Sequence, residues 1–139
     1  MKLENCYESE TQEFKTSLSE LDKGILSLAA MLNKSGKGRI YFGVANDGTV
    51  LGLEGMLGQE TIKKIGTRVA EQIRPAIIPS IHMDVYGDQV VVVLEAEGFN
   101  KPYSAAGEYR IRVGSENKKI DPSVISEMEL SNSIAQMET

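Results

Sequence analysis

The sequence predicts an α+β fold: a mixed β-sheet of about five to six strands, joined in hairpins, with two main helices and a short C-terminal helix. Three observations predict it. Apolar residues recur at helical spacing in two stretches, 18–32 and 58–74. Short runs rich in β-branched and aromatic residues follow these stretches, and turn-forming residues separate the runs. The length of 139 residues suits a single domain over 1–139, with a core at about 8–130 and a frayed tail at 131–139.

The first helix is expected to begin near Ser17. The pattern from Ser17 to Glu20 can close a helix start, because the serine and glutamate side chains each bond to the other's backbone N–H. The second helix is expected over 58–74, with an inward stripe of Ile62, Ile65, Val69 and Ile73. A short last helix is expected over 124–130, since Asp121 can cap it and Pro122 suits its first turn.

The strands are expected between these helices. The run 39–44 is β-rich, and the turn residues 46–48 predict a hairpin in which 49–53 pairs back. A second hairpin is expected from 80–85 and 89–96, with the valine run at 90–94 as a central strand buried on both faces. Residues 108–113 alternate strictly between polar and apolar, which predicts a further strand.

The bulk composition limits the function classes. A net charge of −5 argues against a strong, non-specific, stand-alone DNA binder, because such proteins gain most of their affinity by neutralising phosphates. It leaves room for a local basic face or an acidic metal site. No apolar run approaches the roughly 18 residues of a membrane span, and the polar, acidic start is unlike a signal peptide, so we expect no membrane contact. The single Cys6 cannot form an internal disulfide, which fits a cytoplasmic protein.

Several short motifs occur in a defined order along the chain. They are Glu8-Ser9-x-x-x-Glu13-Phe14-Lys15, Ala29 and Asn33 near the end of the first helix, Gly36-x-Gly38 before Ile40-Tyr41-Phe42-Gly43-Val44, Asn46-Asp47-Gly48 with Gly52, Lys101-Pro102-Tyr103, and the run from Tyr109 to Ser115. The ordered set resembles the Schlafen AlbA-type domain, which is also labelled a DNA-binding domain or a divergent AAA ATPase. The likeness runs from about Glu8 to Glu129 and is that of a single-domain, prokaryotic-type member.

This resemblance implies a function in nucleic-acid binding, to DNA or RNA, of the kind found in prokaryotic regulator-like proteins, where the domain usually precedes a winged helix. In the vertebrate Schlafens, two copies of the fold form a clamp that binds structured RNA. This sequence carries one copy, so the resemblance implies a homodimer if a clamp is to form.

The resemblance also implies an alternative function, a metal-dependent endoribonuclease or nuclease. In the Schlafens that cut RNA, two glutamates five residues apart are followed by an aspartate after the next strand, and Glu8, Glu13 and Asp47 match these positions. Carboxylate oxygens bind Mg²⁺ or Mn²⁺, and such an ion activates a water for attack on phosphorus. The competing interpretation is two exposed glutamates and an ordinary turn aspartate.

A set of basic residues is the candidate nucleic-acid site: Lys15, Lys101, Arg110, Arg112, Lys118 and Lys119. Alternation places Glu108, Arg110 and Arg112 on one face of the predicted strand. Two guanidinium groups on one strand face can bind successive phosphates, each with a pair of hydrogen bonds. The competing interpretation is a solvated face on which these cations pair with acids such as Glu108, at little gain in stability.

A third hypothesis, an ATP-binding protein, follows from the family label. Gly43 and Gly48 lie five residues apart before a hydroxyl residue, as in a phosphate-binding loop. That loop needs a lysine directly after its second glycine and must open a helix, whereas here the lysine is absent and a strand is expected. These glycines are therefore interpreted as turn geometry, and no cofactor is expected beyond Mg²⁺ or Mn²⁺.

Overall fold

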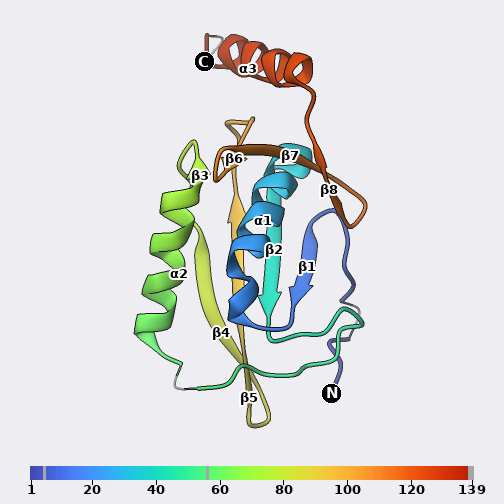
Figure 1. Cartoon of the computed structure of the whole chain (residues 1–139), viewed down its shortest axis with the longest axis vertical. Helices are drawn as coiled ribbons and strands as arrows, with labels where there is room; N and C mark the ends of the chain where they lie inside the picture. The colour runs from blue at the N-terminus through green and yellow to red at the C-terminus, as the bar shows by residue number, and fades with distance from the viewer. Residues whose placement is uncertain (5, 56, 138–139) are drawn as a thin grey trace.

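The structure, a computed structural model, describes residues 1–4, 6–55 and 57–137 and confirms the α+β class. Three α-helices accompany two four-stranded sheets (Figure 1). The predicted number of five to six strands in one sheet is wrong, because the described residues form eight strands divided between two sheets. The additional strands are short, and their sequences lack the apolar alternation by which strands are recognised.

The first sheet has the strand order β1-β2-β5-β4. Its members are β1 (Gln12–Lys15), β2 (Lys37–Phe42), β5 (Gln89–Glu97) and β4 (Ser80–Tyr86). Strand β1 runs parallel to β2, and the other pairs are antiparallel. The hairpin of β4 and β5 is confirmed, and Val91, Val92, Val93 and Leu94 are buried in its inner strand as predicted.

The second sheet has the order β3-β6-β7-β8 and is antiparallel throughout. Its members are β3 (Ile73–Arg74), β6 (Ser104–Ala105), β7 (Glu108–Val113) and β8 (Glu116–Lys119). Strand β7 was predicted, whereas β8, which carries Lys118 and Lys119, was not. Strand β8 pairs with β7 through a tight turn in which Gly114 has a φ of 61°.

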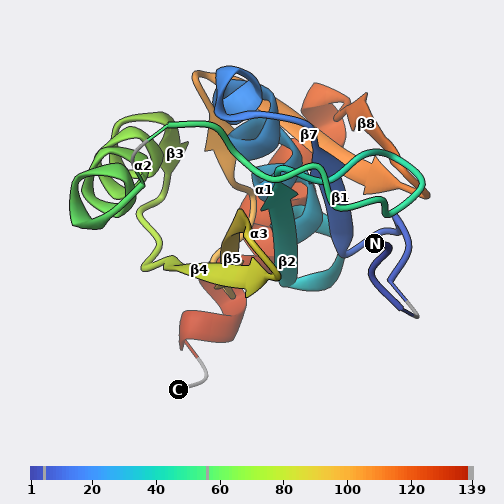
Figure 2. The same ribbon diagram turned by 90° about the horizontal axis from the view of Figure 1, so that it is seen from below.

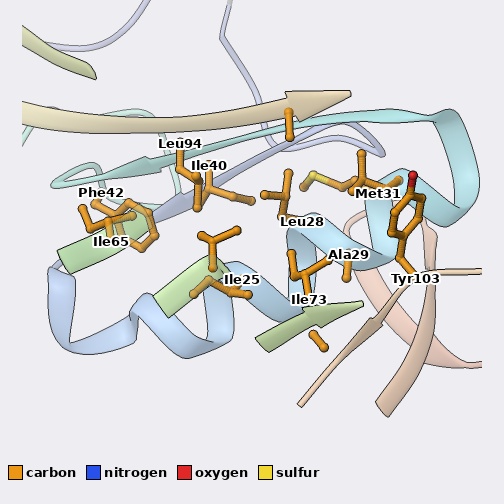
Figure 3. Packing of buried hydrophobic residues seen from close by; sticks show 14 of the residues in the cluster. Ile25, Leu28, Ala29, Met31, Ile40, Phe42, Ile65, Ile73, Leu94 and Tyr103 are labelled. Carbon is orange, nitrogen blue, oxygen red and sulfur yellow. The ribbon is translucent and has the colours of Figure 1, made fainter. Parts of the chain in front are cut away.

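Helix α1 (Leu21–Ser35) lies between the two sheets (Figures 1 and 2). Its residues Ile25, Leu28 and Met31 are fully buried. They form one core with Ile40, Phe42 and Leu94 of the first sheet, Ile73 of the second sheet, and Tyr103, which directly precedes β6 (Figure 3). This central position explains why apolar or small residues occupy every position from Gly24 to Leu32.

The predicted cap at the start of this helix is wrong. Residues Leu18–Glu20 form a 3₁₀ turn, so α1 begins at Leu21 and Ser17 makes no capping bond with its side chain. The Glu20 carboxylate instead accepts a hydrogen bond from the Thr16 N–H at 3.3 Å. At the other end Gly36, with φ of 74°, closes the helix by donating to the Leu32 carbonyl at 3.0 Å.

Helix α2 (Gln59–Gln72) lies within the predicted range and buries Ile65 and Val69, whereas Ile73, which was predicted on this helix, is buried in β3. Helix α3 (Pro122–Met137) is longer than predicted, so the expected tail is helical to Met137, and the rest of it lies outside the described residues. None of its residues is buried, and it extends away from β8 (Figure 1).

The predicted strand at 49–53 is also wrong. Two isolated bridges, Val44 to Val50 and Lys2 to Thr49, involve this segment, and no strand forms over 49–53. The Gly43 carbonyl accepts from both Leu51 and Gly52, and Gly43 and Gly52 have φ values of 102° and 77°. The glycines therefore fold this segment into a loop instead of a regular ladder.

Candidate functional site

A buried ion pair connects the two sheets. Arg112 on β7 has no solvent exposure and Glu13 on β1 has 5%. Arg112 Nη1 lies 2.9 Å from Glu13 Oε1, and Arg112 Nε donates to the Ser9 carbonyl at 3.1 Å. A guanidinium enclosed in this way binds β7 to β1, and its burial does not fit the predicted phosphate contact by Arg112.

Asn117 extends this network to the helix. It lies opposite Arg112 in the β7–β8 ladder, and its Oδ1 accepts from Arg112 Nη1 at 2.9 Å. Its Nδ2 donates to Ser27 Oγ on α1 at 2.8 Å. Sequence analysis missed Asn117, Ser27 and Ser9. The turn at Gly114 was a usable signal for Asn117, because a two-residue turn there sets Asn117 opposite Arg112.

The predicted acidic residues are divided between two places. Glu13 Oε2 lies 3.5 Å from Lys15 Nζ. Glu8 is half-buried, and this burial, together with the negative charge of Glu13, raises the pKa of the Glu8 carboxyl, while Arg112 and Lys15 act in the opposite direction. Glu8, Glu13 and Lys15 therefore form one electrostatic cluster.

Asp47 has a different environment, in the exposed turn after β2. Its Oδ1 accepts from the Thr49 N–H at 2.9 Å, and its Oδ2 lies 3.6 Å from Lys2 Nζ. Hydrogen bonds to Thr49, with the Lys2 ammonium nearby, lower the pKa of Asp47. Within residues 1–4, 6–55 and 57–137, no three Asp, Glu, His or Cys side chains form a group that could hold a metal ion. Glu8 and Glu13 thus lie near each other, whereas Asp47 completes no three-residue group with them in this part of the chain, and no catalytic step is derived from the predicted Mg²⁺ or Mn²⁺ site.

The predicted basic residues gather on the β7–β8 hairpin, apart from Lys15 and Lys101. Arg110 and Lys119 lie directly opposite each other, with side chains on the same face. Arg110 is 23% exposed in its side chain and pairs with Glu108 at 3.2 Å. Lys118 lies on the other face, is 58% exposed in its side chain and pairs with Glu116 at 3.0 Å. We call Arg110, Lys118 and Lys119 the hairpin cations.

Asn33 fixes this hairpin to the loop that carries Lys101. Its buried amide group donates to the carbonyls of Tyr103 at 2.9 Å and Arg110 at 2.7 Å, and its Oδ1 accepts from the Tyr103 N–H at 2.6 Å. The Tyr103 hydroxyl in turn accepts from the Asn100 N–H at 2.9 Å. Two motifs that are distant in the sequence, Asn33 and Lys101-Pro102-Tyr103, are thus parts of one support under β7.

A surface hollow of about 710 Å³ lies elsewhere, at one end of the first sheet. Its lining includes Lys37, Arg39, Glu95 and Glu97. Arg39 Nε lies 2.7 Å from Glu95 Oε2, so opposite charges there neutralise each other. The hollow contains none of the predicted site residues, and its mixed charge gives no preference for an anion.

Two further features concern the predicted ATP-binding loop and the membrane. The loop from Gly43 to Gly48 is followed by residues 49–55, which form no helix, and helix α2 begins only at Gln59, so this loop does not open a helix as a phosphate-binding loop does. Among the helices that the structure describes, none is both long and apolar enough to cross a bilayer.

Comparisons with known proteins place these features in a context. No curated protein matches the sequence. The DIP2311 protein from Corynebacterium diphtheriae has a similar fold, with a TM-score of 0.67 and 18% identity over 88% of this chain; the chain spans only 24% of that protein. The N-terminal domain of a RecG-related protein from Nitrosomonas europaea, whose name refers to an ATP-dependent DNA helicase, has a TM-score of 0.52 and 16% identity, over 82% of this chain and 84% of that domain.

At such identities the two structures support the fold and nothing finer. The family model described as Schlafen, AlbA_2 matches residues 8–121, which include the Glu13–Arg112 pair, Asn33 and the hairpin cations. The chain therefore belongs to the Schlafen AlbA_2 family.

Proposed function

We propose that this chain is a nucleic-acid-binding module of Schlafen type, with a regulatory role, which contacts the phosphates of DNA or RNA through the hairpin cations. Membership of the Schlafen AlbA_2 family supports this proposal, as does the likeness to a domain of a protein named for its relation to a DNA helicase. The observation that carries it is the placement of Arg110 and Lys119 opposite each other on β7 and β8.

The physical reason is the spacing of these two charges. Opposite residues of an antiparallel pair have Cβ atoms about 5 Å apart, so an arginine and a lysine there present two cations side by side. A phosphate oxygen accepts from both, and arginine adds two parallel N–H donors. Arg110 already bonds to the Glu108 carboxylate, which shows that its guanidinium reaches an anion at this surface.

The net charge of −5 limits the mode of binding. Acidic surface elsewhere repels a polyanion, so the interaction is confined to a small patch and is weak at physiological salt. A second copy of the chain would double the patch, and we include a homodimer in the proposal for that reason.

The test is a titration of purified protein with fluorescently labelled structured RNA, duplex DNA and single strands at low salt. Arg110→Ala and Lys119→Ala are expected to weaken binding to every sequence to a similar degree, because phosphate contacts carry no sequence information. Lys64→Ala is the matched control, since this exposed lysine lies on α2, on the other side of α1 from the hairpin. Equal loss in the control, or no binding by the parent protein, would refute the proposal.

A metal-dependent nuclease is the second candidate, and the closeness of Glu8 to Glu13 is the observation that favours it. Each titration is therefore repeated with Mn²⁺ and with EDTA, and the length of the nucleic acid is measured. Glu8→Gln is the informative variant, because Glu8 is half-buried, whereas a change at Glu13 also deprives Arg112 of its partner. Metal-dependent cleavage that Glu8→Gln abolishes would establish an enzyme.

A further inference from the structure

Strand β4 is a long edge that the fold leaves open. It lies at the end of the first sheet and has seven residues. The opposite edge, β1, has four residues, and the edge strand β8 of the second sheet has four, two of them lysines. Natural sheets protect long edges with lysine, proline or a bulge, because unpaired backbone groups attract another strand. Strand β4 contains no lysine, arginine or proline, and its pairing with β5 is regular throughout.

The groups that point outward can be identified from the hairpin. The turn between β4 and β5 has two residues, so Tyr86 and Gln89 close it as a hydrogen-bonded pair. Alternation along an antiparallel ladder then leaves Ile81, Met83 and Val85 with their N–H and C=O groups directed away from β5. In the described part of the chain, no backbone hydrogen bond from outside the sheet reaches these three residues.

We propose that β4 pairs antiparallel with β4 of a second copy, about a two-fold axis at Met83. This inference rests on the homodimer of the proposed function and assigns its surface. This pairing joins the first sheet of one copy to the first sheet of the other, so that one continuous sheet crosses the axis. Such an interface is isologous, since each copy contributes the same residues, and it closes as a dimer without further growth.

The register follows from the outward groups. With Met83 opposite its own counterpart, Ile81 of each copy pairs with Val85 of the other, and all three residues exchange backbone bonds, about six in total. A shift by two residues in either direction leaves at least one outward residue without a bonded partner. Val85 is 66% exposed in the single chain, and the dimer places Ile81 of the second copy beside it.

The side chains on the other face of the strand support the same register. This register sets His82 of each copy opposite Asp84 of the other copy, and the two-fold symmetry produces this pair twice. Residues opposite each other here form a non-hydrogen-bonded pair, in which the side chains lie close together. An imidazole N–H donates well to a carboxylate. Within one chain His82 Nε2 already lies 3.5 Å from Asp84 Oδ1, and because the two side chains are 45% and 37% exposed, each can exchange this contact for the one across the axis. Shifts by two residues would set His82 against His82, or Asp84 against Asp84. Strand β4 is therefore self-complementary, which favours a second copy over an unrelated extended peptide.

Sedimentation equilibrium of the protein without nucleic acid, over a wide concentration range, tests the proposal. We expect a reversible monomer–dimer equilibrium that Val85→Lys shifts to monomer, because lysine blocks an edge. Val113→Lys is the matched control, since Val113 is an exposed strand valine on β7, and it is expected to leave the equilibrium unchanged. Thermal unfolding of each variant verifies that the monomer remains folded.

A charge exchange tests the register itself. His82→Asp sets two carboxylates opposite each other at both symmetric positions and is expected to raise the dissociation constant roughly ten-fold. The double variant His82→Asp with Asp84→His restores opposite partners and is expected to recover most of the affinity. A protein that is monomeric at every concentration overturns both the homodimer and its assignment to the β4 edge. A dimer that is insensitive to Val85→Lys and to the exchange of His82 and Asp84 overturns only the assignment to β4. Neither result depends on nucleic-acid binding.

Discussion

At the scale of single residues, Arg112 determines how the two sheets are joined. Its guanidinium is enclosed, and Glu13 lies 2.9 Å away. Arg112→Met removes the positive charge and leaves a buried carboxylate that Lys15 reaches only at 3.5 Å. We expect a loss of about 3–5 kcal/mol in the free energy of unfolding, the usual cost when one partner of a buried pair is removed. Urea unfolding followed by circular dichroism measures it.

The coupling between the partners has a specific control. The double variant Arg112→Met with Glu13→Leu removes both charges and is expected to be more stable than the sum of the two single losses predicts. Lys118→Met, which breaks the exposed pair with Glu116, is expected to change stability by less than about 1 kcal/mol. Strictly additive losses would show that the Glu13–Arg112 pair does not act as a unit.

The environment of Glu8 predicts the direction in which stability changes with pH. Burial and the charge of Glu13 raise its pKa above the ordinary value of 4.5. The Glu8 carboxyl therefore binds its proton more tightly in the folded protein than in the unfolded chain. The stability that this tighter proton binding contributes is fully present below pH 4.5 and is lost as pH rises through the raised pKa. Glu8→Gln is therefore expected to raise the melting temperature at pH 7 more than at pH 4. An equal shift at both pH values would contradict this assignment.

At the scale of elements, Asn33 connects α1 to β7 and to the loop before β6. Its side chain makes three hydrogen bonds, and Asn33→Ala leaves the Tyr103 N–H and the carbonyls of Tyr103 and Arg110 without this partner. We expect a loss of about 3 kcal/mol, since each buried unsatisfied group costs about 1–3 kcal/mol. Asn46→Ala, in an exposed turn, is the control. Hydrogen exchange in β7 should accelerate in Asn33→Ala, and an unchanged rate would show that Asn33 does not hold this strand.

The elements also show what the sequence could predict. Helix α2, the β4–β5 hairpin and β7 were predicted because each buries a periodic set of side chains. Strands β1, β3, β6 and β8 were missed because they are short and lack apolar alternation, and β1 and β3 also depend on partners distant in the chain. The strand predicted at 49–53 does not form, because positive φ at Gly43 and Gly52 favours a loop that local β-propensity does not indicate.

The candidate site was predictable only where a local pattern in the sequence indicated it. Alternation correctly placed Arg110 and Arg112 on one face of β7, but it could not show that Arg112 is buried against Glu13 of β1 while Glu108 on the same face is exposed. Burial of Arg112 depends on Glu13, Ser9 and Asn117 meeting in three dimensions. Motif spacing gave the positions of Glu8, Glu13 and Asp47, and only the fold shows that Asp47 lies in the exposed turn, paired with Lys2.

At the scale of the whole molecule, the distribution of charge predicts how salt affects binding. An excess of acids gives the chain its net charge of −5, whereas the hairpin cations supply three positive charges on β7 and β8, Arg110 and Lys119 on one face and Lys118 on the other. If three phosphates are neutralised there, the logarithm of the association constant for duplex DNA should fall with the logarithm of salt concentration with a slope of roughly −3. Lys118→Ala and Lys119→Ala should each reduce the magnitude of this slope by about 1. A slope steeper than about −6 would require a second basic surface or a second copy of the chain on the same nucleic acid, and a slope near zero would show that phosphates are not what this hairpin binds.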